Sequence, residues 1–395
     1  MEKTTNLNRR SWLKYSALAA GGVVTSAAFP AFANSKPALG MKPYQGKYSL
    51  MENYHVMMAD RADMKARLLA NENPWGPSKK AVAAIAASAS MGNRYVYNSS
   101  AKMVDFLAEK EGVSKESILL SPGSTDILEK IAFSLFMKGG NIVSADPSYM
   151  SMIRTAESIG GTWKNIPLKA DYSHDLDAMA AAIDDETKLV YICNPNNPTG
   201  TMTPVSEIKA FCKKVSSKVP VFIDEAYMEL LDNPEANTAV SLVQEGYDVI
   251  ICRTFSKIHG MAGLRLGYMA ANEARVKAIK SMVRTEMGIS VTSLEGGMAS
   301  LKDVEFQEFT RKHNKENREY VFAELKKAGM NPIPSFTSFI LFPIQVPTKE
   351  FLTQFMDRGV GIRGFEIDGK PYARVSMGTM DEVKLFTKSL YEIVS

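Results

Sequence analysis

One lysine stands among residues whose types and spacing could do covalent chemistry. Lys257 follows the apolar run Val249–Cys252, comes directly after Ser256, and is followed eight positions later by Arg265 in a glycine-rich stretch. A lysine in a tight, partly desolvated turn can have a lowered pKa, and its amine can then form a Schiff base. An arginine can hold a phosphate by bidentate hydrogen bonds. The segment therefore indicates a pocket for a phosphate-bearing aldehyde such as pyridoxal 5′-phosphate (PLP), although a surface lysine in a glycine-rich loop is the alternative for this segment alone.

Two further segments place polar residues directly after apolar runs. Leu189–Cys193 ends at Asn194–Gly200 (NPNNPTG), and Pro220–Ile223 ends at Asp224. Such runs favour buried parallel strands, and open α/β sheets bind ligands at the carboxyl ends of their strands. A buried Asp needs a cationic or hydrogen-bonding partner, and a protonated pyridine nitrogen is a fitting one. A plain turn and a helix cap are the alternatives, but they do not explain why three strand ends in succession present an Asn, an Asp and a Lys.

In this order, the motifs resemble those of the fold-type I, class I/II PLP-dependent aminotransferases, and most closely the histidinol-phosphate aminotransferase branch. The resemblance runs from about Leu69 to the C-terminus and includes Asn71–Ser78 (NENPWGPS) and Arg374–Thr379 (RVSMGT). It implies an α/β fold with a mainly parallel sheet and helices on both faces, plus a smaller α+β domain. It also implies PLP as cofactor, a homodimer, and ping-pong transfer of an amino group between an amino acid and a 2-oxo acid.

The resemblance assigns roles to individual residues. Lys257 would bind the cofactor and move the substrate proton, Asp224 would hold the ring nitrogen, and Asn197 and Tyr227 would contact the ring hydroxyl. The remaining cofactor contacts would be Gly123, Ser124, Thr125, Tyr149, Ser256 and Arg265. The segment from 121 to 126 also reads as a glycine loop that leads into a helix N-terminus, which favours a phosphate, although a routine helix cap would have the same sequence.

Substrate-binding residues follow from the same resemblance. Arg374 would bind the substrate carboxylate, Asn73 and Arg363 would also contact substrate, and Tyr95 would reach the cofactor phosphate of the partner subunit, with Tyr97 as a rival. Arg363 matches an arginine that can help to bind a substrate phosphate.

Two departures from the family pattern bear on the substrate and on the site. The acidic segment that follows Arg363 (GFEID, residues 364–368) weakens the case for a phosphorylated substrate. His259 stands where the family more often has an apolar or aromatic residue, and we expect it to pack or to form hydrogen bonds rather than act as a second base. The amino donor is therefore open between a histidinol-phosphate-like and an aromatic amino acid.

The N-terminus carries the pattern of an export signal. Asn8–Lys14 (NRRSWLK) contains twin arginines, an apolar stretch follows from 16 to 29, and Ala31–Ala33 is a small-x-small cleavage site. The apolar stretch is too short for a convincing membrane anchor. We therefore expect the twin-arginine export machinery to carry the folded protein to the periplasm, with cleavage after Ala33.

Composition excludes several other function classes. Without residues 1–33, 43 Lys and Arg face 42 Asp and Glu, a net charge of +1, so most of the chain's +4 lies in the signal. No basic patch interleaved with aromatic residues indicates nucleic acid binding. The three cysteines, Cys193, Cys212 and Cys252, form no CxxC or CxxH pair. We expect them to be small core residues, and no metal site is indicated.

The organisation of the chain follows from its length and periodicity. We expect a signal peptide over 1–33, an N-terminal arm and part of the small domain over 34–76, a large PLP-binding domain over 77–289 and a small domain over 290–395. Five apolar runs predict strands in the large domain: 118–120, 142–145, 189–193, 219–223 and 249–252. A long helical stretch from Ser290 through Lys327, short strands at 338–342 and 372–376, and a helix from 381 to 393 are expected in the small domain.

Two other functions remain open. A PLP-dependent lyase or decarboxylase could use the same scaffold, although a carboxylate held by Arg374 is a poor leaving group. A non-catalytic PLP-binding protein is the second alternative, but the complete set of Asn197, Asp224, Lys257 and Arg265 disfavours it.

Overall fold

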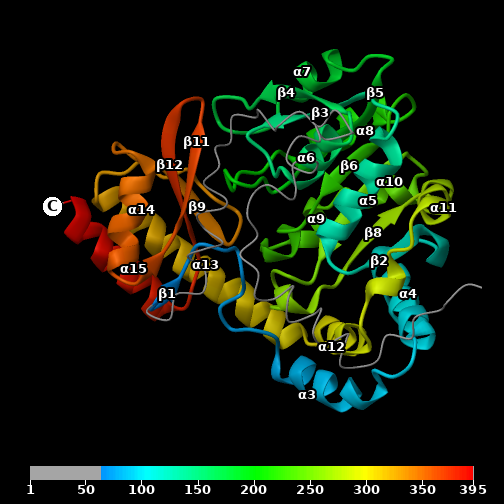
Figure 1. The fold of residues 1–395 in the computed structure, drawn as a ribbon, viewed down its shortest axis with the longest axis horizontal. Coiled ribbons are helices and arrows are strands. Elements are labelled where there is room, and N and C mark those ends of the chain that lie inside the picture. Colours follow the sequence, from blue (N-terminus) through cyan, green and yellow to red (C-terminus); the bar gives the residue numbers. More distant parts are fainter. Residues whose placement is uncertain (1–63, 395) are drawn as a thin grey trace, which may run out of the picture. The chain divides into compact units, whose positions relative to one another are not determined.

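The computed structural model of the protein describes residues 64–394, all of which belong to one unit that spans 43–395 (Figure 1). The expected signal peptide lies outside the described residues. The strands are β1 (Ala66–Arg67), β2 (Ile118–Ser121), β3 (Asn141–Asp146), β4 (Thr162–Pro167), β5 (Thr187–Cys193), β6 (Val221–Asp224), β7 (Val249–Thr254), β8 (Gly267–Ala271), β9 (Phe339–Pro343), β10 (Val360–Gly361), β11 (Arg363–Ile367) and β12 (Lys370–Ser376). The α-helices are α3 (Lys79–Ser88), α4 (Tyr97–Glu111), α5 (Ser124–Phe136), α6 (Ser151–Ser158), α7 (Leu176–Ala181), α8 (Val205–Val215), α9 (Pro234–Asn237), α10 (Ser241–Gln244), α11 (Glu273–Met282), α12 (Val291–Leu301), α13 (Val304–Lys327), α14 (Thr348–Asp357) and α15 (Met380–Val394).

A seven-stranded sheet forms the centre of the larger part, with the order β2-β8-β7-β6-β5-β3-β4. Strands β7, β6, β5, β3 and β4 run parallel, whereas β8 is antiparallel to both of its neighbours, β2 and β7. The five apolar runs of the sequence all become strands of this sheet. The predicted α/β fold, with a mainly parallel sheet, is confirmed.

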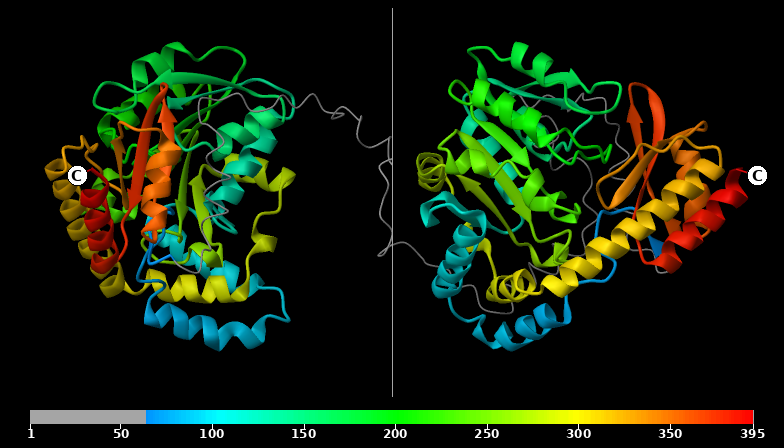
Figure 2. Two further views of the ribbon diagram at one scale, coloured as in Figure 1. Left: turned by 60° about the vertical axis from the view of Figure 1, so that its left-hand side comes forward. Right: turned by 180° about the vertical axis from the view of Figure 1, so that it is seen from behind.

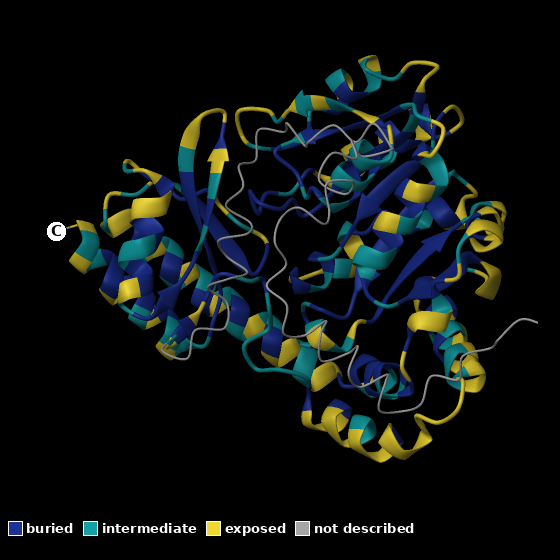
Figure 3. Cartoon of the chain, in the orientation of Figure 1, coloured by how far each residue is buried: buried dark blue, intermediate teal, exposed yellow. Residues whose placement is uncertain are grey.

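Alternating strand residues explain why helices cover both faces of this sheet. In β5, Leu189, Tyr191 and Cys193 pack with α5, α6 and α11, while Val190 and Ile192 pack on the opposite face with α4, α7, α8 and α12. Successive side chains of a strand point to opposite faces, so a strand buried on both sides must be apolar throughout. Figure 3 shows most strands of this sheet as dark, buried ribbons between partly exposed helices, whereas the edge strand β4 is half-buried or exposed along its length.

A smaller sheet follows in the C-terminal part of the chain. Strands β11, β12 and β9 pair antiparallel in that order, and β1 pairs with β10, which joins the start of the described chain to its last quarter. The core of this part is formed by residues of β1, β9, β12, α13, α14 and α15. Figure 2 shows the long helix α13 extending from α12 along the smaller sheet.

The structure differs from the sequence prediction at one helix and at five strands, since β1, β4, β8, β10 and β11 were not expected. The helix expected from Ser290 through Lys327 is two helices, because Asp303 leaves helical geometry (φ −93°, ψ 66°) and accepts an ion pair from Lys80 at 2.8 Å. Strand β4 was not predicted because it is a half-exposed edge strand of mixed polarity. Strand β8 was not predicted because it follows the glycine-rich motif without a turn signal.

The described helices include none with both the length and the apolar character that a membrane span requires. In the same part of the chain, no three His, Cys, Asp or Glu side chains come together as a metal site would need. All three cysteines are buried.

Candidate active site

The predicted site residues meet in a cavity of about 280 Å³. Its floor is formed where β5, β6 and β7 end, at Cys193, Asp224 and Thr254. The N-terminus of α5, the segment after β1 and the smaller sheet complete its wall. The predicted residues that line it are Ser124, Thr125, Tyr149, Asn197, Asp224, Tyr227, Ser256, Lys257, Arg265, Arg363 and Arg374. Gly123 lies next to this lining, at the N-cap of α5.

Lys257 is one of the residues that line the cavity. Its Nζ donates to the backbone oxygen of Asn71 at 2.7 Å and lies 5.4 Å from the centre of the Tyr227 ring. Burial, assisted by the positive charge of Arg374, lowers the pKa of the Lys257 amine to about 8. A substantial fraction of this amine is therefore neutral, and thus nucleophilic, near pH 7 to 8.

Asp224 is a buried carboxylate, 2% exposed, at the end of β6. It accepts hydrogen bonds from the Tyr191 hydroxyl at 3.2 Å and from the Ala226 amide at 3.1 Å. Burial nevertheless raises its pKa to about 6, because these neutral donors do not replace the water that the charge has lost. A cationic N–H group in the cavity would stabilise the ionised carboxylate.

A cradle for an anion lies in the same cavity, where α5 begins. Gly123 has a φ of +87°, and a Cβ at this position would clash with the guanidinium of Arg265. Gly267 also needs to be small, because its Cβ would lie 2.7 Å from the amide nitrogen of Ser124. The glycines thus let Arg265 and the first amides of α5 approach each other, beside the hydroxyl of Ser256. Exposed amides at a helix N-terminus and a guanidinium together favour a phosphate.

Arg374 lies on β12 with its guanidinium buried. Its Nη1 donates to Oδ1 of Asn197 at 2.6 Å, and its guanidinium carbon lies 4.9 Å from the Phe339 ring and 5.1 Å from the Phe365 ring. Its Nε has no hydrogen-bond partner within residues 64–394. Burial, together with the charge of Arg363, lowers the pKa of Arg374 to about 9, so the surrounding protein does not fully compensate its charge. A carboxylate would satisfy both the open donor and the charge.

A second cavity of about 380 Å³ continues from the first and shares Tyr149, Asn197, Arg363 and Arg374 with it. This outer pocket is further lined by Arg154, Phe365, Glu129 and Glu366, among others. It combines aromatic surface with charges of both signs. A substrate whose carboxylate lies at Arg374 could extend its side chain here.

Besides Gly123, four residues that the sequence singled out lie outside the lining of the inner cavity: Asn73, Tyr95, Tyr97 and His259. The Asn73 amide donates to the backbone oxygen of Ile258 at 2.9 Å, so it holds the segment after Lys257. Tyr95 and Tyr97 are 75% and 69% exposed, and they line a surface groove of about 770 Å³. His259 is buried behind the cavity, where its ring packs on Phe255 with centroids 4.8 Å apart.

Sequence reasoning missed two residues that organise the site. Asn71 accepts from Lys257 through its backbone, donates from its amide to the Tyr227 hydroxyl at 2.8 Å, and accepts from the Ser376 hydroxyl at 2.7 Å. Asn71 belongs to the same short motif as Asn73, the residue that the sequence predicts to contact substrate. The Tyr191 hydroxyl donates to Asp224, and the available signal was this one hydroxyl within the apolar run Leu189–Cys193.

The residues present fit PLP. The cradle at Gly123 and Arg265 suits a phosphate, the buried Asp224 suits a protonated ring nitrogen, and Lys257 supplies an amine in the same cavity. Tyr149, Asn197 and Tyr227 line the same space. Burial raises the pKa of Asp224, and a cationic ring nitrogen would stabilise its ionised form, so this site favours a cationic ring over a neutral one.

Comparisons with known proteins agree with this site. Residues 63–390 match the family described as aminotransferase class I and II. The chain is 34% identical to a histidinol-phosphate aminotransferase of Moorella thermoacetica over 83% of this chain and 85% of that protein, and 35% identical to one of Brevibacillus brevis over 83% and 90%. The crystal structure of a histidinol-phosphate aminotransferase from Sinorhizobium meliloti with pyridoxal-5′-phosphate is similar at a TM-score of 0.80 and 25% identity, covering 94% of this chain and 99% of that one. The chain therefore belongs to the class I and II aminotransferases, with the fold-type I architecture, and is a PLP-dependent transaminase.

Proposed function

We propose that the protein transfers an amino group from a histidinol-phosphate-like or aromatic amino donor to a 2-oxo acid by a ping-pong mechanism. The observation that carries this proposal is the meeting of three groups in one cavity: the Lys257 amine, the buried Asp224 and the Arg374 guanidinium with its open Nε. The first two suit proton transfer on an electron-accepting ring. The third suits a substrate carboxylate.

PLP, when bound, supplies a carbonyl that condenses with amines and a ring that takes up electrons from the substrate α-carbon. Lys257 moves the proton at that carbon. Its lowered pKa suits this task, because a base whose pKa lies near the working pH is available in its neutral form and still binds a proton well. The contact between its Nζ and the Asn71 oxygen keeps the amine inside the cavity.

Asp224 holds the proton on the ring nitrogen. The bonds from Tyr191 and Ala226 fix its carboxyl group, and the apolar interior of the sheet excludes water around it. The Tyr227 hydroxyl and the Asn197 amide line the same cavity and are held by Asn71 and Arg374. We assign to them the contact with the ring hydroxyl.

Arg374 orients the substrate. A carboxylate that bonds to Nε and to a terminal nitrogen would be held by a fork, and the two phenyl rings prevent the guanidinium from turning away. The outer pocket then receives the side chain. For an amino acid donor, Arg154 and Arg363 there favour an anionic side chain, and Tyr149 and Phe365 favour an aromatic one. Histidinol phosphate, which the names of the relatives point to, has a phosphate ester in place of the carboxylate, so that phosphate would lie at the arginines and the imidazole would take the side-chain position.

Steady-state kinetics test this proposal. The PLP-loaded protein would be assayed with histidinol phosphate, phenylalanine, tyrosine and tryptophan as donors and 2-oxoglutarate as acceptor, with glutamate formation as the signal. The proposal predicts one preferred donor and parallel lines in double-reciprocal plots. Release of carbon dioxide and an amine instead would identify a decarboxylase, and the absence of turnover with every donor would contradict the proposed substrate class.

We propose a homodimer in which Tyr95 contributes to the cofactor site of the partner. The support is that Tyr95 and Tyr97 are large aromatic residues exposed on the surface of this chain, in a groove that also contains Met287 and Ile289. Apolar surface of this kind is typical of protein interfaces. Sedimentation equilibrium would test the dimer, and a monomer with full activity would contradict it.

We also propose export by the twin-arginine route with cleavage after Ala33. The support is the sequence pattern alone, since residues 1–33 lie outside the described part of the chain. N-terminal sequencing of the protein from a periplasmic fraction is expected to begin at Asn34. An intact Met1 in the cytosol would contradict the proposal.

A further inference from the structure

Two chain segments carry the central residues of the site, and both continue behind the cavity. After β6, the chain passes from Asp224 and Tyr227 into a short 3₁₀ helix, Met228–Leu230. After β7, it passes from Lys257 to His259. Glu229 and His259 are therefore each two residues beyond a residue that lines the cavity. Neither Glu229 nor His259 is part of the lining itself.

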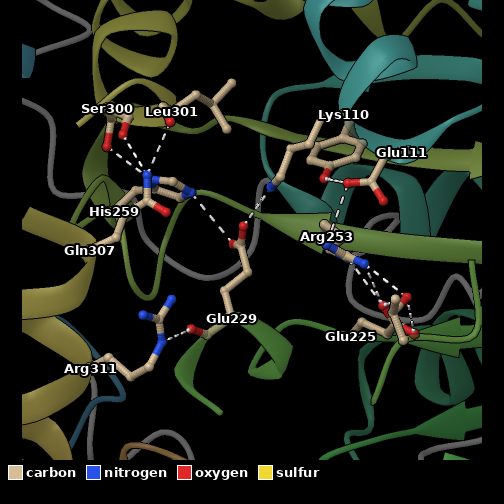
Figure 4. A network of polar contacts seen from close by, with 12 residues as sticks. Lys110, Glu111, Glu225, Glu229, Arg253, His259, Ser300, Leu301, Gln307 and Arg311 are labelled. Atoms are coloured by element: carbon tan, nitrogen blue, oxygen red, sulfur yellow. Dashed lines mark hydrogen bonds and ion pairs between the residues drawn. The ribbon is translucent and has the colours of Figure 1, made fainter. Parts of the chain in front are cut away.

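These two residues meet in the network shown in Figure 4. Nε2 of His259 lies 3.5 Å from Oε2 of Glu229, and its Nδ1 lies 2.8 Å from the Ser300 hydroxyl on α12. Glu229 is bound in turn by Lys110 of α4 at 2.9 Å, and its backbone oxygen accepts from Nε of Arg311 on α13 at 3.1 Å. The imidazole thus connects the segment that carries Lys257 to the segment that carries Asp224, and also to α12.

Burial makes this connection specific. His259 is 1% exposed, and the Glu229 side chain is 15% exposed. Burial alone would raise the pKa of Glu229, but Lys110 and His259 together hold it well below its usual range, so Glu229 is a carboxylate at neutral pH. A phenyl ring in place of the imidazole could still pack on Phe255, but it could not contact both the carboxylate and the Ser300 hydroxyl.

We propose that His259 is a positioning residue, which holds the Lys257 amine at its place over Tyr227 by joining the two segments through Glu229. This inference rests on the proposed role of Lys257. Because the ring of His259 is rigid, its contacts with Glu229 and Ser300 fix the backbone of residue 259, which is only two residues from Lys257. The amide of Asn73, which binds the backbone oxygen of Ile258 at 2.9 Å, fixes the residue in between.

Two substitutions separate the contacts of the imidazole. In His259→Gln, the terminal amide stands about where Nε2 stands and can still donate to Glu229. In His259→Asn, the shorter amide stands near Nδ1, so it can bond to Ser300 but cannot reach Glu229. The matched control is His174→Asn: His174 is also 1% exposed, its Nδ1 lies 2.8 Å from the Thr203 hydroxyl, and its Nε2 has no partner within residues 64–394.

The first measurement uses the PLP-free protein and does not depend on its activity. Acetic anhydride labelling of Lys257 across pH, read by mass spectrometry, reports the pKa of its amine, expected near 8 in the wild type. In His259→Asn the amine should gain solvent, and its apparent pKa should rise by about one unit toward the ordinary value. His259→Gln and His174→Asn should both retain the wild-type profile.

The second measurement is the kinetics of the PLP-loaded protein. Loss of a buried bond to a charged group should lower kcat about tenfold in His259→Asn, with KM for the oxo acid changed much less. The kcat of His259→Gln should be much closer to that of the wild type than the kcat of His259→Asn is. The affinity for PLP, measured by fluorescence titration, should be weaker in His259→Asn than in His259→Gln, and His259→Gln should be close to the wild type.

The outcomes distinguish positioning from mere stability. Lower thermal stability of His259→Asn with an unchanged Lys257 profile and unchanged kcat would overturn the proposal, as would a folded His259→Gln that behaves like His259→Asn. If His259→Asn does not fold, the profile of His259→Gln decides alone, since any departure from the wild type would contradict the assigned geometry. A wild-type protein that does not transaminate would refute the proposed function but leave the labelling result readable.

Discussion

Replacement of Arg374 by lysine isolates the contribution of the guanidinium fork. Arg374 is 2% exposed, uses Nη1 on Asn197 at 2.6 Å, and keeps an open Nε between two phenyl rings. Lysine retains the positive charge but cannot bond simultaneously to Asn197 and to both oxygens of a carboxylate. At least one charge-assisted hydrogen bond to substrate is lost, which is about 1.5–3 kcal/mol, or roughly a 10- to 100-fold change in affinity.

The assay is steady-state transamination with each substrate varied in turn. Arg374→Lys should raise KM for every substrate that carries an α-carboxylate, the oxo acid included, by roughly 10- to 100-fold, while kcat changes much less. The affinity for PLP should change much less, because the lysine amine can still donate to Asn197 and the phosphate cradle at Gly123 and Arg265 is unchanged.

A neighbouring arginine provides the matched control. Arg363 pairs with Arg374 in the register of β11 and β12 and lines both cavities, but its proposed contact is with the side chain of the substrate. Arg363→Lys should therefore leave KM for a short oxo acid such as pyruvate unchanged. Equal KM values for Arg374→Lys and the wild type, or equal effects of the two substitutions on pyruvate, would refute the assignment of Arg374 to the carboxylate.

Three further predictions follow from the burial and geometry of the site. The pKa of Asp224 in the folded, PLP-free protein is raised to about 6, so ionisation of this carboxyl group above pH 6 lowers the free energy of unfolding by ~3 kcal/mol, a loss that is absent below pH 4. Asp224→Asn should therefore be more stable than the wild type by up to this amount in urea titrations at pH 8. Equal stability of the two proteins at pH 8 would contradict the reasoning. Gly123→Ala should weaken PLP binding at least tenfold, because its Cβ displaces Arg265 and the residue has a positive φ; wild-type affinity in an equilibrium titration would exclude the cradle. Tyr95→Phe should weaken PLP binding only if the protein is a dimer, so an effect that persists in a dilute monomer would contradict a contact across subunits.

Strand ends were the part of the site that the sequence could predict. Asn197, Asp224 and Lys257 each follow an apolar run, and parallel strands bring their carboxyl ends to one edge of a sheet, so the meeting of these residues was expected before the structure. The assignment of their roles came from the family resemblance. The motif order thus predicted both the fold and the cofactor.

Contacts that depend on tertiary packing could not be predicted in the same way. Asn71 and Asn73 share one motif, and only the path of the chain after β1 decides that Asn71 turns to Tyr227 while Asn73 turns to Ile258. The bond from Tyr191 to Asp224 depends on strand register between β5 and β6. The partner of His259 comes from a segment 30 residues earlier in the sequence, with no local signal.

The central claim is that Lys257 carries out transamination in this cavity. The most direct measurement is a single turnover, in which the PLP-loaded protein is mixed with its preferred amino donor in the absence of any acceptor. The released carbonyl product is then quantified: an oxo acid from an amino acid, or the corresponding ketone from histidinol phosphate. The account predicts one carbonyl product per active site for the wild type and none for Lys257→Ala. A yield from Lys257→Ala equal to that of the wild type, or carbon dioxide in place of the carbonyl product, would contradict it.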